Sequence, residues 1–85
     1  MKEINGKKYS FKEFDPYKLR IKMEYIVSNA IHSVDIYTEE EDINIAYEGI
    51  MDILKDKPYQ FEMVNYSTKE QDDLDREFIN KFLDF

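Results

Sequence analysis

The chain of 85 residues lacks several residue types on which protein chemistry often depends. It has no cysteine, which excludes disulfides and thiolate chemistry and fits a reducing compartment. A single histidine leaves too few nitrogen and sulfur ligands for the usual zinc site within one chain. Two glycines are too few for a glycine-rich phosphate loop, so dinucleotide and P-loop nucleotide binding are not expected. We therefore predict a protein that is not an enzyme and has no cofactor and no metal site.

Long apolar runs and the pattern of a signal peptide are also missing. We accordingly expect no membrane span, no export and a cytoplasmic location. Seven tyrosines, six phenylalanines and a hydrophobic fraction of 42% nevertheless predict a folded core. The length predicts one domain over residues 1–85.

The charge is unevenly distributed along the chain, whose net charge is −7. Residues 1–34 carry seven basic and four acidic side chains, a net charge of +3. Residues 35–85 carry five basic and fifteen acidic side chains, a net charge of −10. Such asymmetry favours an oriented partner if it survives folding as a polarised surface. A net negative chain is a poor ligand for nucleic acid, so we expect a protein partner instead.

The first third of the chain predicts a hairpin followed by a helix. Asn5-Gly6 tolerates positive φ at both central turn positions, which suits a two-residue hairpin loop. Asp15-Pro16 has the composition of a helix start, with the aspartate as the N-cap. Apolar residues at helical spacing follow, and they predict a central helix over 16–34 that ends near the only histidine, His32. This apolar set is Tyr17, Leu19, Ile21, Met23, Tyr25, Ile26, Val27, Ala30 and Val34.

The rest of the chain predicts two more helices and a strand. A capping box over 38–41 precedes an amphipathic helix over 43–56, in which Gly49 is expected to admit a close neighbour. Residues 59–66 alternate as a strand should, and we expect this strand to join the N-terminal hairpin. A second capping box over 67–70 precedes a helix with an apolar stripe of Leu74, Phe78, Phe82 and Phe85. The predicted fold is α+β in the order ββααβα, with three helices packed on a short antiparallel sheet.

Acidic side chains dominate the candidate functional residues. Some lie away from the apolar stripe of the 43–56 helix, others crowd its start, and others gather early in the last helix. The simpler interpretation is that they are solvated helix faces that complement helix dipoles. The functional interpretation is that they imitate a run of phosphates and bind a cationic nucleic-acid groove on a partner, with tyrosines as anchors. The candidate partner-binding residues are Glu39, Glu40, Glu41, Asp42, Glu48, Asp52, Asp72, Asp73, Asp75 and Tyr37.

Two resemblances give these patterns a context. In size, acidity and lack of catalytic motifs, the chain resembles small phage-encoded inhibitors of host defence, including anti-CRISPR proteins and other DNA mimics. This resemblance implies an inhibitor in the cytoplasm of a bacterial host, whose acidic residues engage a defence protein. The segment Ile4-Asn5-Gly6-Lys7-Lys8-Tyr9-Ser10-Phe11, followed by Phe14-Asp15-Pro16, is similar to the opening of some phage tail-assembly chaperones. That second resemblance implies a binding protein without an active site.

The leading hypothesis is thus a non-enzymatic inhibitor that blocks a cationic nucleic-acid-binding site by charge mimicry. The alternative is a tail-assembly chaperone or structural adaptor that binds through the apolar width of the 16–34 helix and through the hairpin.

Overall fold

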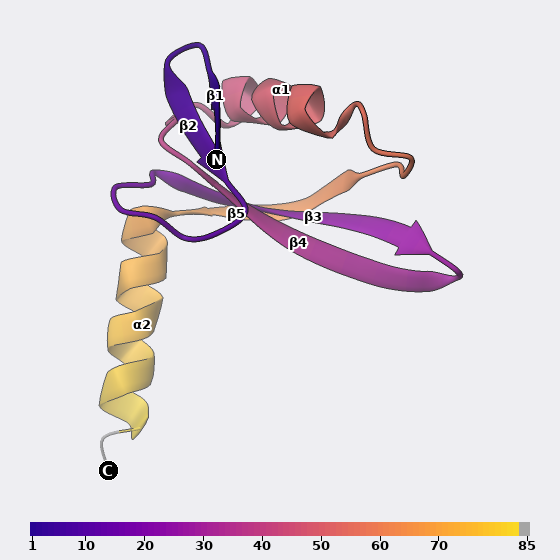
Figure 1. Ribbon diagram of the computed structural model, residues 1–85. Helices are drawn as coiled ribbons and strands as arrows, with labels where there is room; N and C mark the ends of the chain where they lie inside the picture. Colours follow the sequence, from indigo (N-terminus) through magenta and orange to yellow (C-terminus); the bar gives the residue numbers. More distant parts are fainter. Residues whose placement is uncertain (84–85) are drawn as a thin grey trace.

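The computed structural model describes residues 1–83, which form a five-stranded antiparallel sheet and two helices (Figure 1). Along the sheet the strands lie in the order β1-β2-β4-β3-β5. The elements are β1 (Lys2–Ile4), β2 (Lys7–Ser10), β3 (Leu19–Val27), β4 (Ala30–Thr38), α1 (Ile43–Leu54), β5 (Glu62–Thr68) and α2 (Lys69–Leu83). The α+β class is confirmed, but the order is ββββαβα, and the predicted third helix over 16–34 is absent.

A long hairpin of β3 and β4 takes the place of that helix. Leu19, Ile21 and Met23 alternate with charged side chains along β3, and the apolar set is buried while the charged set is partly exposed. Such alternation turns every second side chain toward one face of a sheet. Asp15-Pro16 is a cis peptide in the loop before β3, and no helix begins there. The prediction was wrong because the same apolar residues satisfy both helical and strand spacing.

The turns of both hairpins have the same backbone conformation. The predicted loop at Asn5-Gly6 is confirmed, with φ of 53° and 78°. The β3–β4 loop uses Ser28 and Asn29, with φ of 52° and 65°. Positive φ at both central positions defines the type I′ turn, whose twist matches that of the flanking strands.

Replacing Ser28-Asn29 with Asn-Gly is therefore expected to stabilise the protein. Glycine adopts positive φ without the steric cost that Asn29 bears, so the free energy of unfolding should rise by up to about 1 kcal/mol. Urea denaturation of the double variant measures this change. A lower midpoint would show that the Ser28 and Asn29 side chains contribute more than the turn conformation does.

The hydrophobic core lies between one face of the sheet and α1. Ile21, Met23 and Ile36 from the central strands meet Ala46 and Ile50 from the helix, and all five are buried. Burying an aliphatic side chain of this size contributes about 1.5–3 kcal/mol. Tyr9 of β2 completes this cluster and lies against Gly49, near the middle of α1. The β1–β2 hairpin and α1 lie on the same side of the long β3–β4 hairpin, and α2 projects from the other side (Figure 1).

Both helices begin at caps that differ by a few residues from the predicted ones. The Asp42 carboxylate accepts hydrogen bonds from the backbone N–H groups of Asn44 at 2.9 Å and Ile45 at 3.3 Å, so Asp42 is the N-cap of α1. Thr38 instead ends β4. At the start of α2, the Thr68 hydroxyl accepts from the backbone N–H of Gln71 at 3.1 Å. The helices themselves were predicted correctly because their amphipathic spacing is local.

The predicted strand over 59–66 is found as β5, shifted toward the C-terminus. It pairs with β3 at an edge of the sheet, and not with the N-terminal hairpin as expected. Thr68 ends β5 and Lys69 begins α2, so no loop separates the strand from the helix. Phe85, the last residue of the predicted apolar stripe, lies outside the described residues.

Candidate functional site

The outer side of α1 carries an acidic stripe, which we define as Glu48 and Asp52 together with Glu41 in the segment just before the helix. Glu48 and Asp52 are four residues apart, so they fall on one side of α1. All three are exposed, whereas Ala46 and Ile50 on the opposite side of α1 are buried in the core. Asp52 forms an ion pair with Lys55, whose Nζ lies 2.9 Å from the Asp52 carboxylate. An exposed ion pair of this kind contributes little to the free energy of folding, and it leaves the stripe accessible to a partner.

The acidic run before α1 serves partly as local structure. The carboxylate of Glu39 accepts a hydrogen bond from the backbone N–H of Lys8 at 3.0 Å, which ties this loop to β2. Glu40 accepts from the backbone N–H of Glu41 at 3.2 Å, and Asp42 caps α1. Glu41 is exposed and lies just before the Asp42 N-cap.

The two acidic clusters of the sequence meet at a shallow groove. Glu41 lines one part of it, and Glu70 and Asp73 from α2 line another. Lys18 and Lys69 line the same groove. The ammonium of Lys69 lies 3.6 Å from carboxylates of both Asp73 and Asp15. The segment before α1 and the start of α2 therefore share an acidic groove, which the two lysines partly neutralise.

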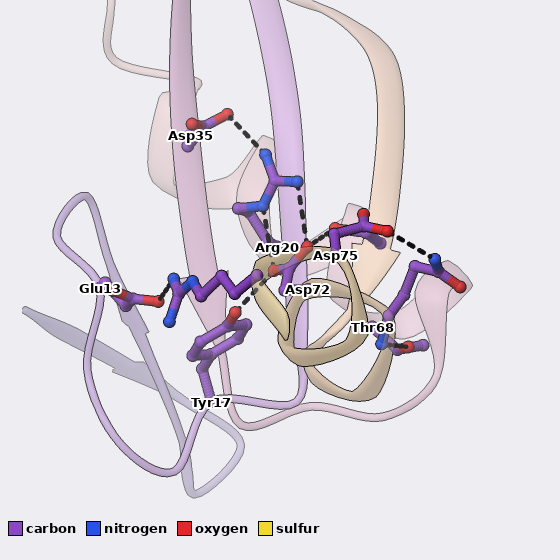
Figure 2. A network of polar contacts seen from close by, with 10 residues as sticks. Glu13, Tyr17, Arg20, Asp35, Thr68, Asp72 and Asp75 are labelled. Carbon is purple, nitrogen blue, oxygen red and sulfur yellow. Dashed lines mark hydrogen bonds and ion pairs between the residues drawn. The ribbon is translucent and has the colours of Figure 1, made fainter. Parts of the chain in front are cut away.

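Asp72 is removed from that surface, because it is only 6% exposed and forms the centre of a polar network (Figure 2). Its carboxylate accepts hydrogen bonds from the Tyr17 hydroxyl at 2.6 Å and the Ser67 hydroxyl at 2.8 Å. The guanidinium of Arg20 donates two more, each at 3.1 Å. Arg20 also lies 3.9 Å from Asp35. Asp72 thus joins α2 to β3 and β5, and its carboxylate is not available to a partner.

The electrostatics of this network follow from its geometry. Burial alone would raise the pKa of the Asp72 carboxyl, but the hydrogen bonds from Arg20, Tyr17 and Ser67 outweigh burial and hold that pKa below its ordinary value. Burial and the neighbouring Asp72 carboxylate both raise the pKa of the Tyr17 hydroxyl. Asp72 is therefore ionised and Tyr17 is a neutral hydrogen-bond donor at neutral pH.

Tyr37 and Asp75 lie near this network and apart from the α1 stripe. Tyr37 packs edge-on against Tyr17 with ring centroids 5.1 Å apart, and it alternates along β4 with the core residue Ile36. It therefore lies on the sheet face opposite α1. Asp75 accepts a hydrogen bond from the Gln71 side chain at 3.1 Å. The structure thus brings Glu41 and Asp73 to one groove, leaves Glu48 and Asp52 on the exposed side of α1, and places Tyr37, Asp72 and Asp75 elsewhere.

His32 lies on β4, and not near the end of a helix as predicted. Its ring stacks on Tyr25 of β3, with centroids 5.4 Å apart. Tyr25 also stacks on Tyr59 and contacts Phe61, so the imidazole belongs to an aromatic cluster at that end of the sheet. Within residues 1–83, no group of histidine and carboxylate side chains has an arrangement that would hold a metal ion. Neither helix in this part of the chain is long and apolar enough to cross a membrane.

Comparison with protein-family models, with curated proteins and with solved structures finds no match to this chain.

Proposed function

We propose that this protein is a non-enzymatic binding protein whose acidic α1 stripe occupies a cationic nucleic-acid-binding site on another protein. The observation that carries the proposal is the exposure of Glu48 and Asp52 on one side of α1, with the exposed Glu41 just before the helix. Helix geometry spaces the carboxylates of Glu48 and Asp52 by about 6 Å along the axis. A row of fixed negative charges is what a phosphate-binding groove attracts.

The groove between the segment before α1 and the start of α2 supports the same function. Glu41, Glu70 and Asp73 add further acidic side chains there. Like charges held this close repel one another and lower the stability of the folded chain, so a cationic partner would relieve that repulsion on binding. The resemblance to anti-CRISPR proteins and DNA mimics adds the proposal that the partner is a defence protein of a bacterial host.

The alternative function, an assembly chaperone or structural adaptor, has less support than the inhibitor. The predicted 16–34 helix is a hairpin, and Tyr17, Ile21 and Met23 from its apolar set are buried. In the N-terminal hairpin, Tyr9 is buried in the core as well.

The test compares two double charge reversals in a capture experiment. Wild-type protein and the Glu48→Lys/Asp52→Lys variant are immobilised, exposed to bacterial lysate and eluted with rising salt. Proteins that elute from the wild type are identified by mass spectrometry, and their affinities are measured after purification. The stripe variant is expected to bind at least about tenfold more weakly, because two favourable charge contacts become repulsive. The wild type should also displace DNA from the captured protein in a fluorescence anisotropy assay.

The matched control is Glu24→Lys/Glu62→Lys. These two residues are cross-strand neighbours on β3 and β5, away from α1, and their reversal changes the net charge by the same amount. Equal weakening by both double variants would contradict the α1 stripe as the binding surface. A captured protein that binds wild-type protein and DNA at the same time would contradict the mimicry.

A further inference from the structure

A cavity of about 210 Å³ lies between the β1–β2 hairpin and the C-terminal end of α1, which are on the same side of the sheet (Figure 1). Its inner wall is formed by Tyr9, Ile36 and Ile53, and each of these side chains is at most 8% exposed. Met1 and Phe11, which are 75% and 52% exposed, line its outer part. The charged residues at its rim are Lys2, Asp56 and Lys57.

The hairpin and the turn after α1 bring the two lysines of the rim together. Lys2 pairs with Tyr9 across β1 and β2, and directly opposed residues of two strands place their side chains on the same face. On the helix side, the backbone N–H of Lys57 donates a hydrogen bond to the carbonyl of Leu54 at 3.0 Å, which holds Lys57 beside the end of α1. Two lysines that are far apart in the sequence therefore line one cavity.

The volume and the walls of the cavity select the kind of ligand. An apolar cavity of about 150 Å³ is large enough to hold benzene. The cavity of 210 Å³ therefore has room for a six-membered ring with a short substituent. Tyr9 and Phe11 offer aromatic surfaces, and aromatic rings attract one another beyond the area that they bury. These properties favour a ligand with a single aromatic ring.

The charges at the rim select the substituent on that ring. Lys2, Lys57 and Asp56 give the rim a net charge of +1 in a chain whose net charge is −7. Within residues 1–83, neither of the two lysines forms an ion pair with a carboxylate. The long, flexible lysine side chain can bring its ammonium group to a ligand carboxylate at the mouth of the cavity. Asp56 and the carbonyl end of α1 oppose an anion there, so the preference for a carboxylate requires both lysines.

We propose that this cavity binds a small aromatic carboxylate, with the ring against Tyr9 and Phe11 and the carboxylate between Lys2 and Lys57. The proposal is independent of the proposed function, because the residues of the acidic α1 stripe do not line the cavity.

Titration of the isotope-labelled full chain with phenylacetate, followed by NMR, tests the proposal. We expect saturable shifts of the amide signals of the lining residues, with a Kd of about 0.1–1 mM, which is within the reach of a ligand with roughly ten non-hydrogen atoms. Phenylacetamide, which has the same shape without the charge, should bind at least about fivefold more weakly, and 2-phenylethylamine more weakly still. An absence of saturable shifts up to about 10 mM phenylacetate, or equal binding of phenylacetate and 2-phenylethylamine, would overturn the proposal.

A pair of double charge reversals tests the role of the lysines. Lys2→Glu/Lys57→Glu should raise the Kd of phenylacetate about tenfold or more, because two favourable charges become repulsive. The matched control is Lys7→Glu/Lys81→Glu, which changes the net charge by the same amount at exposed positions outside the cavity. Equal weakening by the two double variants would reflect net charge alone and would overturn the assignment of the carboxylate to Lys2 and Lys57.

A second pair of variants tests the aromatic wall. Phe11→Ala should raise the Kd of phenylacetate about fivefold, because the ring of the ligand loses an aromatic contact. The matched control is Phe78→Ala, which removes a phenylalanine of α2 that is 69% exposed and should leave the Kd unchanged. Far-UV circular dichroism confirms that all four variants remain folded, as expected for exposed positions. An unchanged Kd in Phe11→Ala would place the ligand outside the cavity and overturn the proposal.

Discussion

Replacement of Asp72 by alanine is expected to lower the free energy of unfolding by about 3 kcal/mol, because it breaks a largely buried ionic network. The Tyr17 hydroxyl and the Arg20 guanidinium would lose their acceptor, and such groups are costly to leave unsatisfied when buried. Urea denaturation monitored by circular dichroism measures the change. The control is Asp73→Ala, which removes an exposed carboxylate 3.6 Å from Lys69 and should cost less than about 1 kcal/mol.

The same network predicts how the effect depends on pH. The pKa of Asp72 is lower in the folded protein than in the unfolded chain, where it is about 3.9. The stabilisation from Asp72 is therefore fully present above that unfolded value and is lost as the pH falls through the folded value. The difference between wild type and Asp72→Ala should be constant near neutral pH and should shrink on acidification. A difference that grows on acidification would contradict the assignment of Asp72 as an ionised acceptor.

A second large effect is expected at Gly49, on the side of α1 that faces Tyr9. A Cβ atom at this position would lie 2.5 Å from the Tyr9 Oη atom and 2.7 Å from Cζ. In an exposed helix, alanine would be favoured over glycine by about 1 kcal/mol. Here the buried Tyr9 ring has to move, and we expect Gly49→Ala to destabilise the protein by about 1–3 kcal/mol despite the better helix propensity.

Two further variants separate the close approach from helix propensity. Tyr9→Phe in the Gly49→Ala background removes the nearest atom and should recover part of the loss in thermal denaturation. Glu48→Ala, next to Gly49 and exposed on the outer side of α1, should change stability by less than about 0.5 kcal/mol. If Gly49→Ala raised the melting temperature, the contact with Tyr9 would be too loose to matter.

Features that are determined by residues close together in the sequence could be predicted from it. Asn5-Gly6 encodes its turn directly, and the amphipathic spacing of α1 and α2 is complete within each helix. The close neighbour expected at Gly49 is confirmed, since Tyr9 lies there. The identity of that neighbour is set by the packing of β2 against α1. A local sequence pattern does not contain this information.

The error at residues 16–34 came from two periodicities that share the same apolar residues. Leu19 and Met23 are four residues apart, which suits a helix, and Ile21 between them suits a strand. The alternation of charged residues with these three was the signal that favoured a strand. The turn at Ser28-Asn29 carries a weaker signature than Asn-Gly, so the sequence did not mark where one strand ends and the next begins.

The role of Asp72 could not be predicted for a different reason. In the sequence it is one of several acidic residues at the start of a helix, and it is adjacent to Asp73. Only the tertiary arrangement places Asp72 against Arg20 of β3 and leaves Asp73 in solvent. A rotation of about 100° about the helix axis therefore separates a structural carboxylate from a candidate binding residue.

The direct junction of β5 with α2 makes chain length critical at this position. Each residue of an α-helix turns the chain by about 100°, so one residue inserted between Thr68 and Lys69 would rotate every later side chain of α2 by that angle. Asp72 would then point away from Arg20 and Tyr17, and the apolar stripe of α2 would turn toward another side of the domain. The part of the loop between α1 and β5 that precedes Tyr59 carries no such constraint, because its side chains from Lys55 to Pro58 are exposed. Insertions and deletions should thus be tolerated in that loop and excluded from the strand–helix junction.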